Sequence, residues 1–398
     1  MPYGFGQLTS LQTLTKFVLV KKNASSSRHR YGSGISELSS LNSLRGSLEI
    51  KGLENLRNNA ATEVNAANLV KKPFLKSLTL RWEDDDSDEN MDNFSKDELI
   101  LEVLQPHSKI RSLLVYGSGG ARFCDWLSSI SNLLKLYISG CPELQYLPQL
   151  HQLPHLENLT LKWMPSLEYI DCDGSEEECS FSSTTSSSAL FFPSLRSLRL
   201  QGNCNLQGWW RSSSEVAVKA TEHHLASFSR LSELYVDECP NLISMPLNPH
   251  VEKLTCIKVG KKMLHQFLKP PTSTTATGRR SQATSSSLSH HSSVSKLRYL
   301  NIENIRDLES LPRKLFSNLT SLQNLSIRKC HKLKYVSPIL QHLSALQELR
   351  VSNCDQLDLY NDGNYGMHGR NLAPSVPCSS GGFLSWCIFQ RVFNMLPP

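Results

Sequence analysis

The chain has 398 residues, a formal net charge of +6 and 11 cysteines. This length is enough for two or three globular domains or for one long repeat array. The charge falls short of the clustered basic field of a dedicated nucleic-acid binder. The first twenty residues lack the pattern of a secretory signal, and no stretch reaches the roughly 20 apolar residues of a membrane span. We therefore expect a cytoplasmic protein without a disulfide framework.

A nine-residue pattern, L-x-x-L-x-L-x-x-C, recurs along the chain. Its clear copies end at Cys141, Cys239, Cys330 and Cys354. Copies with another ninth residue begin at Leu156, Leu195 and Leu297, and weaker copies begin at Leu44, Leu75, Ile110 and Val251. Starts at 110, 133 and 156 are 23 residues apart, and those at 297, 322 and 346 are 25 and 24 apart. Such spacing is typical of leucine-rich repeats, whose period is about 20 to 29 residues.

The pattern predicts an α/β leucine-rich-repeat solenoid, or horseshoe. Each L-x-L segment alternates like a strand, so its leucines point inward and the strands form a curved parallel sheet on the concave face. Prolines after each copy favour a loop-rich convex side with at most short helices. We expect one repeat domain over residues 1–361, with about ten to twelve irregular repeats, and a disordered non-repeat tail over 362–398.

Polar insertions are predicted near residues 83–95, 171–190, 208–226 and 270–292. Their serine, threonine and acidic residues cannot support a packed core, so we interpret them as surface loops. The acidic run that begins at Glu83 lacks the glycine and closing glutamate of a calcium loop. The minority hypothesis is that such loops contribute to recognition.

The repeat cysteines Cys141, Cys239, Cys330 and Cys354 stand where the chain leaves each strand. A side chain at this position can satisfy backbone groups that the turn would otherwise leave buried and unpaired. Neither C-x-x-C pairs nor histidines at zinc spacing accompany them, so a structural role is favoured over a metal or redox role.

No pattern in the sequence predicts an enzyme. There is no G-x-x-x-x-G-K-[ST] phosphate loop and no G-x-S-x-G nucleophile turn, and we expect no cofactor, no metal site and no catalytic residue.

The phrase C-P-x-L-x-x-L-P at Cys141 to Pro148 resembles the repeat region of plant nucleotide-binding leucine-rich-repeat disease-resistance proteins. The segments GQLTSLQTLTKFVLV, ISELSSLNSLRGSLEIKGLENL and AATEVNAANLVKKPFLKSLTLRW resemble, in the same order, a segment of the coiled-coil branch of that family. The resemblance covers most of the chain, but the nucleotide-binding module is absent from it.

The resemblance implies the recognition and regulatory region of an intracellular immune receptor. Its protein partner would be a pathogen effector, a guarded host protein or the receptor's own nucleotide-binding module. The chain is then a piece of a longer receptor, a truncated paralogue or a gene-model fragment. The alternative is a stand-alone interaction scaffold or adaptor.

The partner is expected to bind residues between and just after the strand leucines. Aromatic residues and arginines, which are enriched at binding hot spots, occur among them. The predicted residues are Tyr137, Lys162, Trp163, Arg199, Glu233, Tyr235, Asp237, Tyr299, Asn301, Glu303, Arg328, Lys329 and Arg350. An acidic group that includes Glu233, Asp237, Glu238 and Glu303 precedes a basic group of Arg328, Lys329 and Arg350, so the sequence predicts a polarised face.

Overall fold

The computed structural model describes residues 4–20, 34–57, 67–83, 92–170, 191–210, 228–246, 250–268 and 296–357. Contacts divide the chain into two compact units: unit 1 is Met1–Leu231 with Glu238–Pro246, and unit 2 is Ser232–Asp237 with Leu247–Pro398. The predicted tail at 362–398 and the predicted insertions at 171–190 and 270–292 lie outside the described residues. So do residues 84–91 and 211–226 of the other two insertions.

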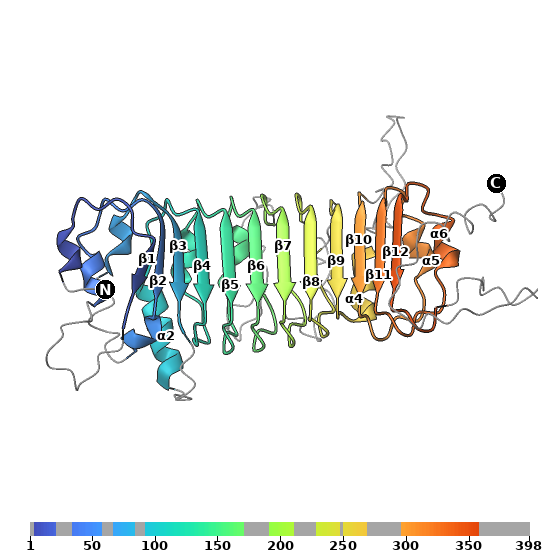
Figure 1. Cartoon of the computed structure of the whole chain (residues 1–398), viewed down its shortest axis with the longest axis horizontal. Coiled ribbons are helices and arrows are strands. Elements are labelled where there is room, and N and C mark those ends of the chain that lie inside the picture. The colour runs from blue at the N-terminus through green and yellow to red at the C-terminus, as the bar shows by residue number, and fades with distance from the viewer. Residues whose placement is uncertain are drawn as a thin grey trace, which may run out of the picture. The chain divides into compact units, whose positions relative to one another are not determined.

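The strands of each unit are parallel and follow the order of the chain (Figure 1). Unit 1 contains β1 (Lys16–Val18), β2 (Gly46–Lys51), β3 (Leu75–Arg81), β4 (Ser112–Tyr116), β5 (Lys135–Ser139), β6 (Asn158–Lys162) and β7 (Ser197–Gln201). Unit 2 contains β8 (Glu233–Asp237), β9 (Lys253–Ile257), β10 (Tyr299–Glu303), β11 (Asn324–Arg328) and β12 (Glu348–Ser352). The predicted leucine-rich-repeat fold is confirmed: every predicted copy contains one strand, and β1 is a strand that the pattern did not show.

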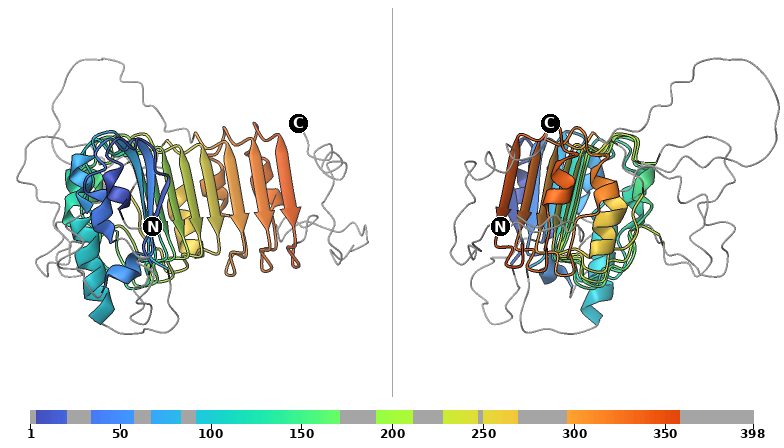
Figure 2. Two further views of the ribbon diagram at one scale, coloured as in Figure 1. Left: turned by 60° about the vertical axis from the view of Figure 1, so that its left-hand side comes forward. Right: turned by 90° about the vertical axis from the view of Figure 1, so that its right-hand side faces the viewer.

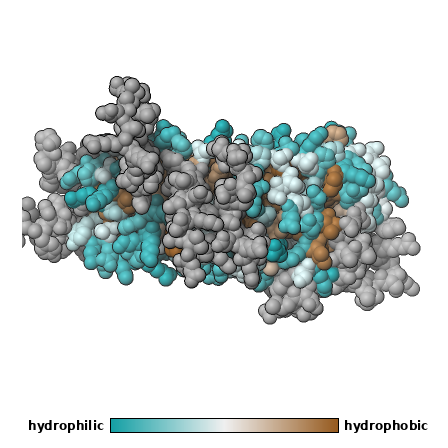
Figure 3. Space-filling view, turned by 180° about the vertical axis from the view of Figure 1, so that it is seen from behind, coloured by the Kyte–Doolittle hydropathy of each residue, from teal (hydrophilic) through white to brown (hydrophobic). Residues whose placement is uncertain are grey.

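Short helices and turns connect the strands and lie on one side of them (Figure 2). The α-helices are α2 (Asp92–Val103), α4 (Lys261–Leu268), α5 (Arg313–Phe316) and α6 (Ser337–Leu340). The 3-10 helices are η1 (Phe5–Gln7), η2 (Ile35–Leu38), η3 (Leu53–Leu56), η5 (Leu69–Lys71), η6 (Asp125–Ser129) and η7 (Leu150–Gln152). The side that carries these connections is mostly hydrophilic, with a few apolar strips (Figure 3). Helix α2, with 12 residues, is longer than the short helices that the sequence predicted.

The strands align without a register shift from β3 through β7 and from β8 through β12. In unit 1, for example, Leu136 lies opposite Leu159, and in unit 2 Leu300 lies opposite Leu325. Alternation along a strand then places all leucines of the L-x-L segments on one side, where they are buried. Each such side chain contributes about 1.5–3 kcal/mol of hydrophobic stabilisation.

A residue with positive φ follows β2 and every strand from β4 to β12. At seven of these positions the backbone N–H still bonds to the last carbonyl of the next strand, as Gly117 does to Ser139 and Trp163 does to Gln201. The left-handed conformation thus turns the chain out of the sheet without losing a ladder hydrogen bond. Glycine occupies this position after β2, β4, β5 and β7. Residues with a side chain occupy it elsewhere, as Trp163 and Lys329 do, which costs roughly 1–2 kcal/mol each.

Helix α2 is fixed to its neighbours by one buried carboxylate. Asp97 accepts two hydrogen bonds from the guanidinium of Arg57, at 2.8 and 2.7 Å, and one from the indole Nε1 of Trp82 at 3.0 Å. The backbone N–H of Gly119 supplies a fourth, at 2.9 Å. The carboxylate therefore joins three successive repeats, and burial of its charge is offset because all its acceptor sites are used.

Four aromatic rings of unit 1, which flank the two central insertions in the sequence, pack together: Phe191, Phe192, Trp209 and Phe228. Their ring centroids lie 5.0–5.9 Å apart, mostly in tilted or edge-to-face arrangements. Aromatic pairs of this kind stabilise beyond their buried area. The buried cluster therefore extends the core of unit 1 to the repeats that the insertions interrupt.

Replacing Asp97 by alanine tests the role of this carboxylate. The change leaves three buried donors without their acceptor, so we expect the free energy of unfolding to fall by about 3–5 kcal/mol. Urea denaturation followed by tryptophan fluorescence measures it. Leu99→Ala on the same helix is the control, because Leu99 is 57% exposed and its loss should matter little. A loss below about 1 kcal/mol for Asp97→Ala would contradict the assignment.

Lys72 is a fully buried lysine in unit 1. Its Nζ donates to the carbonyls of Leu38, at 2.6 Å, and Leu41, at 3.4 Å, and lies 3.4 Å from Oδ1 of Asn42. Burial lowers the pKa of Lys72 from 10.5 to about 8. The lysine satisfies the carbonyls of the turn after η2, at the cost of placing an ammonium group in the core.

This lowered pKa predicts a pH dependence of stability. Between pH 8 and pH 10.5 the unfolded chain holds the Lys72 proton and the folded chain releases it, so stability rises with pH by at most about 3 kcal/mol. The free energy of unfolding should therefore increase across this window in the wild type relative to Lys72→Met. A difference between the two proteins that does not change with pH would refute the lowered pKa.

Candidate functional site: the outward face of the sheet

The outward side chains of the strands lie in three rows across each unit, because the strands share one register. We call these rows leading, central and trailing, and together they form the sheet face. In unit 2, for example, Tyr299, Asn301 and Glu303 of β10 belong to the leading, central and trailing rows. The residue with positive φ follows the trailing row.

All thirteen predicted binding residues take places in this scheme. The central row contains Tyr137, Arg199, Tyr235, Asn301 and Arg350, and the leading row contains Glu233 and Tyr299. The trailing row contains Lys162, Asp237, Glu303 and Arg328, and the positive-φ position contains Trp163 and Lys329. Asn301 is buried, and the other twelve are exposed or half-exposed.

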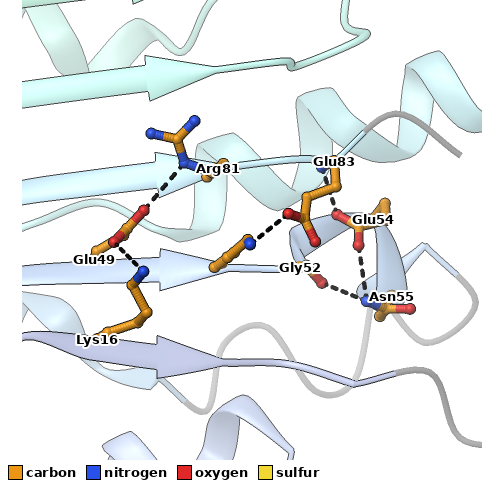
Figure 4. A network of polar contacts seen from close by, with 8 residues as sticks. Lys16, Glu49, Gly52, Glu54, Asn55, Arg81 and Glu83 are labelled. Atoms are coloured by element: carbon orange, nitrogen blue, oxygen red, sulfur yellow. Dashed lines mark hydrogen bonds and ion pairs between the residues drawn. The ribbon is translucent and has the colours of Figure 1, made fainter.

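An ion network covers the first strands of unit 1 (Figure 4). Glu49 of β2 lies 3.3 Å from Nζ of Lys16 on β1 and 3.1 Å from Nε of Arg81 on β3. Burial alone would raise the pKa of Glu49, but the hydrogen bonds from Arg81 and Lys16 outweigh it and leave that pKa below its usual value. At neutral pH this end of the face is therefore a fixed, fully ionised cluster.

Cations and tyrosines continue from this cluster across the next three strands. The Arg81 guanidinium lies 4.1 Å from the centroid of the Tyr116 ring, and the Tyr116 and Tyr137 rings are 5.1 Å apart. Nζ of Lys162 lies 5.7 Å from the Tyr137 centroid. We call Arg81, Tyr116, Tyr137 and Lys162 the cation–tyrosine ladder. Its members hold one another in place, so little side-chain entropy remains to be lost when a partner binds.

Half of this ladder was missed in the sequence. Tyr137 and Lys162 were predicted, but Arg81 and Tyr116 belong to the weak copies at Leu75 and Ile110 and were not. The signal was nevertheless there, because both residues stand directly after the second apolar residue of the L-x-L segment. The same position gave Lys162 in the copy at Leu156.

Trp163 lies at the end of the ladder in a strained backbone conformation. Its φ is +54°, and its side chain is 47% exposed. Gly202, at the same position of the next repeat, makes room for it, because a Cβ there would meet the indole ring at 2.1 Å. Exposing a large apolar ring at a strained position benefits stability little, which points to a role in binding.

The charged residues of unit 2 are paired rather than separated. Glu303 bonds to Lys329 at 2.9 Å, and Arg350 bonds to Glu348 at 2.5 Å. Glu233 lies 3.8 Å from Lys253. Members of the predicted acidic and basic groups, such as Glu303 and Lys329, thus pair with each other, and the face of unit 2 is less polarised than the sequence suggested.

The four repeat cysteines are buried, and three of them donate to a strand carbonyl two residues earlier. Their Sγ atoms lie 3.7, 3.5 and 3.5 Å from the carbonyl oxygens for Cys141, Cys330 and Cys354. Asn203 has the equivalent place after β7, where it donates to Leu161 O and accepts from Met164 N, both at 3.1 Å. These contacts support the structural role proposed from the sequence.

In the part of the chain that the structure describes, no three histidine, cysteine or acidic side chains are grouped so that they could hold a metal ion. The same residues contain no helix that is long and apolar enough to cross a membrane.

Comparison with known proteins agrees with this geometry. Residues 35–164, which contain the whole cation–tyrosine ladder, match the family model described as R13L1/DRL21 LRRs. The match to leucine-rich repeats of this type covers residues 35–164 alone. Such a segment is a non-catalytic binding module, and the predicted resemblance is confirmed.

Similarity to disease-resistance proteins extends over most of the chain. It is 29% identical over 321 residues to the disease resistance protein RGA2 of Solanum bulbocastanum, covering 78% of this chain. It is 30% identical over 319 residues, or 79% of this chain, to the putative disease resistance protein RGA1 of the same species. The chain spans only 27% and 28% of the lengths of these relatives.

Among solved structures, a leucine-rich-repeat protein of Leptospira interrogans covers 88% of this chain, and the chain covers 80% of it, at 15% identity and a TM-score of 0.34. The fold assignment rests on the parallel strand register of this chain and not on this similarity.

Thiol labelling tests the burial of the repeat cysteines. Burial raises the pKa of Cys141 to about 12 and also raises that of Cys330, so their reactive thiolates are scarce at neutral pH. Cys204 is exposed and serves as the internal control. We expect N-ethylmaleimide at pH 7.5 to modify Cys204 at least about tenfold faster than either, as measured by peptide mass spectrometry. Equal rates would show that the repeats open readily or that the cysteines are misplaced.

Proposed function

We propose that this region recognises a protein partner through the sheet face as the recognition and regulatory part of a plant intracellular immune receptor. The partner is a pathogen effector, a guarded host protein or the receptor's own nucleotide-binding module. The proposal includes a cytoplasmic location, and the similarity to disease-resistance proteins supports it.

One observation carries the choice of surface. Trp163 is held exposed and strained beside Lys162, at the end of a preorganised ladder of two cations and two tyrosines. Tryptophan, tyrosine and arginine are the residues that most often dominate binding energy at protein interfaces. Tyr116 contacts both Arg81 and Tyr137, and such a cluster of hot-spot residues favours a binding surface over an ordinary solvated one.

The alternative is a stand-alone interaction scaffold or adaptor with the same binding face. Sequencing the transcript upstream of Met1 separates the two. An in-frame nucleotide-binding module supports the receptor, and a start codon with none supports the scaffold.

Two variants on the sheet face test the binding surface. The chain is fused to a biotin ligase, expressed in leaf tissue, and the labelled proteins are quantified for the wild type, Arg81→Glu and Trp163→Gly. Loss of a hot-spot residue costs at least about 2 kcal/mol, so labelling of the true partner should fall by roughly 30-fold in each variant. Glycine suits the positive φ, so Trp163→Gly should leave the melting temperature nearly unchanged.

Arg306→Glu is the matched control, since Arg306 is exposed in the turn after β10 and away from the strands. Labelling that falls equally in all three variants would indicate a general loss of folding or expression rather than loss of one binding surface. Labelling that is unchanged in Arg81→Glu and Trp163→Gly would show that the partner binds elsewhere.

A further inference from the structure

Cations and carboxylates are distributed unequally between the two units of the sheet face. The outward rows of unit 1 contain six exposed or half-exposed cations: Lys16, Lys51, Arg81, Lys135, Lys162 and Arg199. Among the described residues of these rows, Glu49 has the only carboxylate. The rows of unit 2 contain three cations and four carboxylates: Lys253, Arg328 and Arg350, and Glu233, Asp237, Glu303 and Glu348. The face of unit 1 therefore has an excess of positive charge that the face of unit 2 lacks.

Near β1, β2 and β3 this positive charge is largely balanced. The carboxylate of Glu49 lies 3.3 Å from Nζ of Lys16 and 3.1 Å from Nε of Arg81 (Figure 4). Glu83, just after β3, lies 2.6 Å from Nζ of Lys51. The rest of the acidic run after Glu83 lies outside the described residues. Among the described strands, the excess charge therefore belongs to β5, β6 and β7.

Two lysines on β5 and β6 have no carboxylate partner in the part of the chain that the structure describes. Lys135 belongs to the leading row of β5, and Lys162 belongs to the trailing row of β6. Glu157 precedes β6, and its N–H bonds to the carbonyl of the residue before Lys135. Its carboxylate, however, lies 4.0 Å from Nε of Arg196. Both ammonium groups are therefore available to carboxylates from another molecule.

Tyr137 lies between the two lysines. It stands two residues after Lys135 on the same side of β5, which is about 7 Å along the strand. Its ring centroid lies 5.7 Å from Nζ of Lys162 and 5.1 Å from the centroid of Tyr116. A lysine beside an aromatic ring keeps its charge while its side chain is restrained, so it loses less entropy when it pairs with a carboxylate.

We infer that Lys135, Tyr137 and Lys162 form a lysine–tyrosine site that binds an acidic segment of the protein partner. One carboxylate of the segment pairs with each lysine, and the chain between the two carboxylates packs on Tyr137. Trp163 directly follows Lys162 and is exposed, so the same segment can reach its indole ring. The inference rests on the proposed function and specifies the chemistry of the partner at one part of the sheet face.

The spacing of the two lysines sets the spacing of the two carboxylates. Lys135 lies opposite Asn158, so four residues along the strand and one strand spacing separate Lys135 from Lys162. At about 3.4 Å per residue and 4.8 Å between strands, their Cα atoms are roughly 14 Å apart. Extended chain advances about 3.3 Å per residue, so acidic residues about four positions apart match both lysines.

Nucleic acid is the other kind of polyanion that lysines and tyrosines bind. Single strands stack their bases on open aromatic faces. On this face the Arg81 guanidinium lies 4.1 Å from the Tyr116 centroid, Lys162 lies beside Tyr137, and the two tyrosine rings contact each other. Because cations and rings already cover one another, the arrangement favours an acidic protein segment.

Selection from a library of random linear dodecapeptides displayed on phage tests the site. The complete chain is the target, and phage that bind a double variant, Lys135→Gln with Lys162→Gln, are removed first. We expect the enriched sequences to share at least a pair of aspartates or glutamates. One enriched peptide is then synthesised with a fluorophore, and its affinity is measured by fluorescence polarisation.

The double variant should bind this peptide at least about tenfold more weakly than the wild type, because two exposed ion pairs are lost. Lys135→Arg with Lys162→Arg keeps both charges and should stay within about threefold of the wild type. Lys253→Gln is the matched control, because Lys253 has the leading-row position in unit 2 but lies 3.8 Å from Glu233. It should bind within about twofold of the wild type. Since these lysines are exposed or half-exposed, all variants should keep the wild-type melting temperature.

Three results would overturn the inference. The first is a set of enriched peptides without an excess of acidic residues. The second is equal affinity of the peptide for the wild type and the double variant. The third is a single-stranded RNA of about 20 nucleotides that displaces the peptide at equal concentration, which would assign the site to nucleic acid.

These outcomes are separate from the leaf-tissue test of the sheet face. If Arg81→Glu and Trp163→Gly lose their partner but the selected peptides do not depend on the two lysines, the inference fails and the proposed function stands. If acidic peptides bind through the lysines while both leaf-tissue variants keep their partner, the lysine–tyrosine site stands and the surface proposed for the partner fails.

Discussion

In-register parallel pairing of the strands is the constraint on which the rest of this structure depends. A shift of one residue between two neighbours would move leucines from the core to the surface and polar residues into the core. The register is instead continuous from β3 through β7 and from β8 through β12, and from β4 onward each strand has only five residues. The turn with positive φ secures it, because its N–H bonds to the end of the next strand and fixes where each strand stops.

The same constraint creates the surface that we propose for binding. Because the leucines of each repeat are buried in the core, the residues between and after them must lie in rows on the other side of the strands. Side chains that are far apart in sequence can then contact one another across neighbouring strands, as they do from Arg81 through Tyr116 to Lys162. In the proposed function, stability and recognition use alternate residues of the same strands, and Trp163 is a place where the outward residue carries a cost for the fold.

The repeat frame and the sheet face were predictable from the sequence because both follow from a period of two within a strand and of about two dozen between strands. The frame located a strand in every copy and assigned Tyr137, Lys162 and Arg328 to the outward side. It did not give β1, whose segment has no clear L-x-L, or helix α2, which depends on the buried carboxylate of Asp97. It also did not show that Glu303 and Lys329 pair, since their separation of 26 residues becomes contact only through the register.

The burial of Asn301 was beyond sequence reasoning for a similar reason. Its position in the pattern is the same as that of Tyr137, and only the relative heights of Thr255, Ser326 and their neighbours decide that one is covered and the other is not. Which outward residues are exposed therefore depends on the lengths of the side chains on neighbouring strands, and the sequence pattern along one strand does not show it.

Site-specific photo-crosslinking tests whether a partner binds the outward side of the strands. A benzophenone amino acid at Thr160, in the central row between Tyr137 and Arg199, is compared in leaf tissue with the same amino acid at His155, in the connection before β6. Binding through the sheet face predicts a crosslinked partner from position 160 and none from position 155. A crosslink from position 155 alone would contradict it.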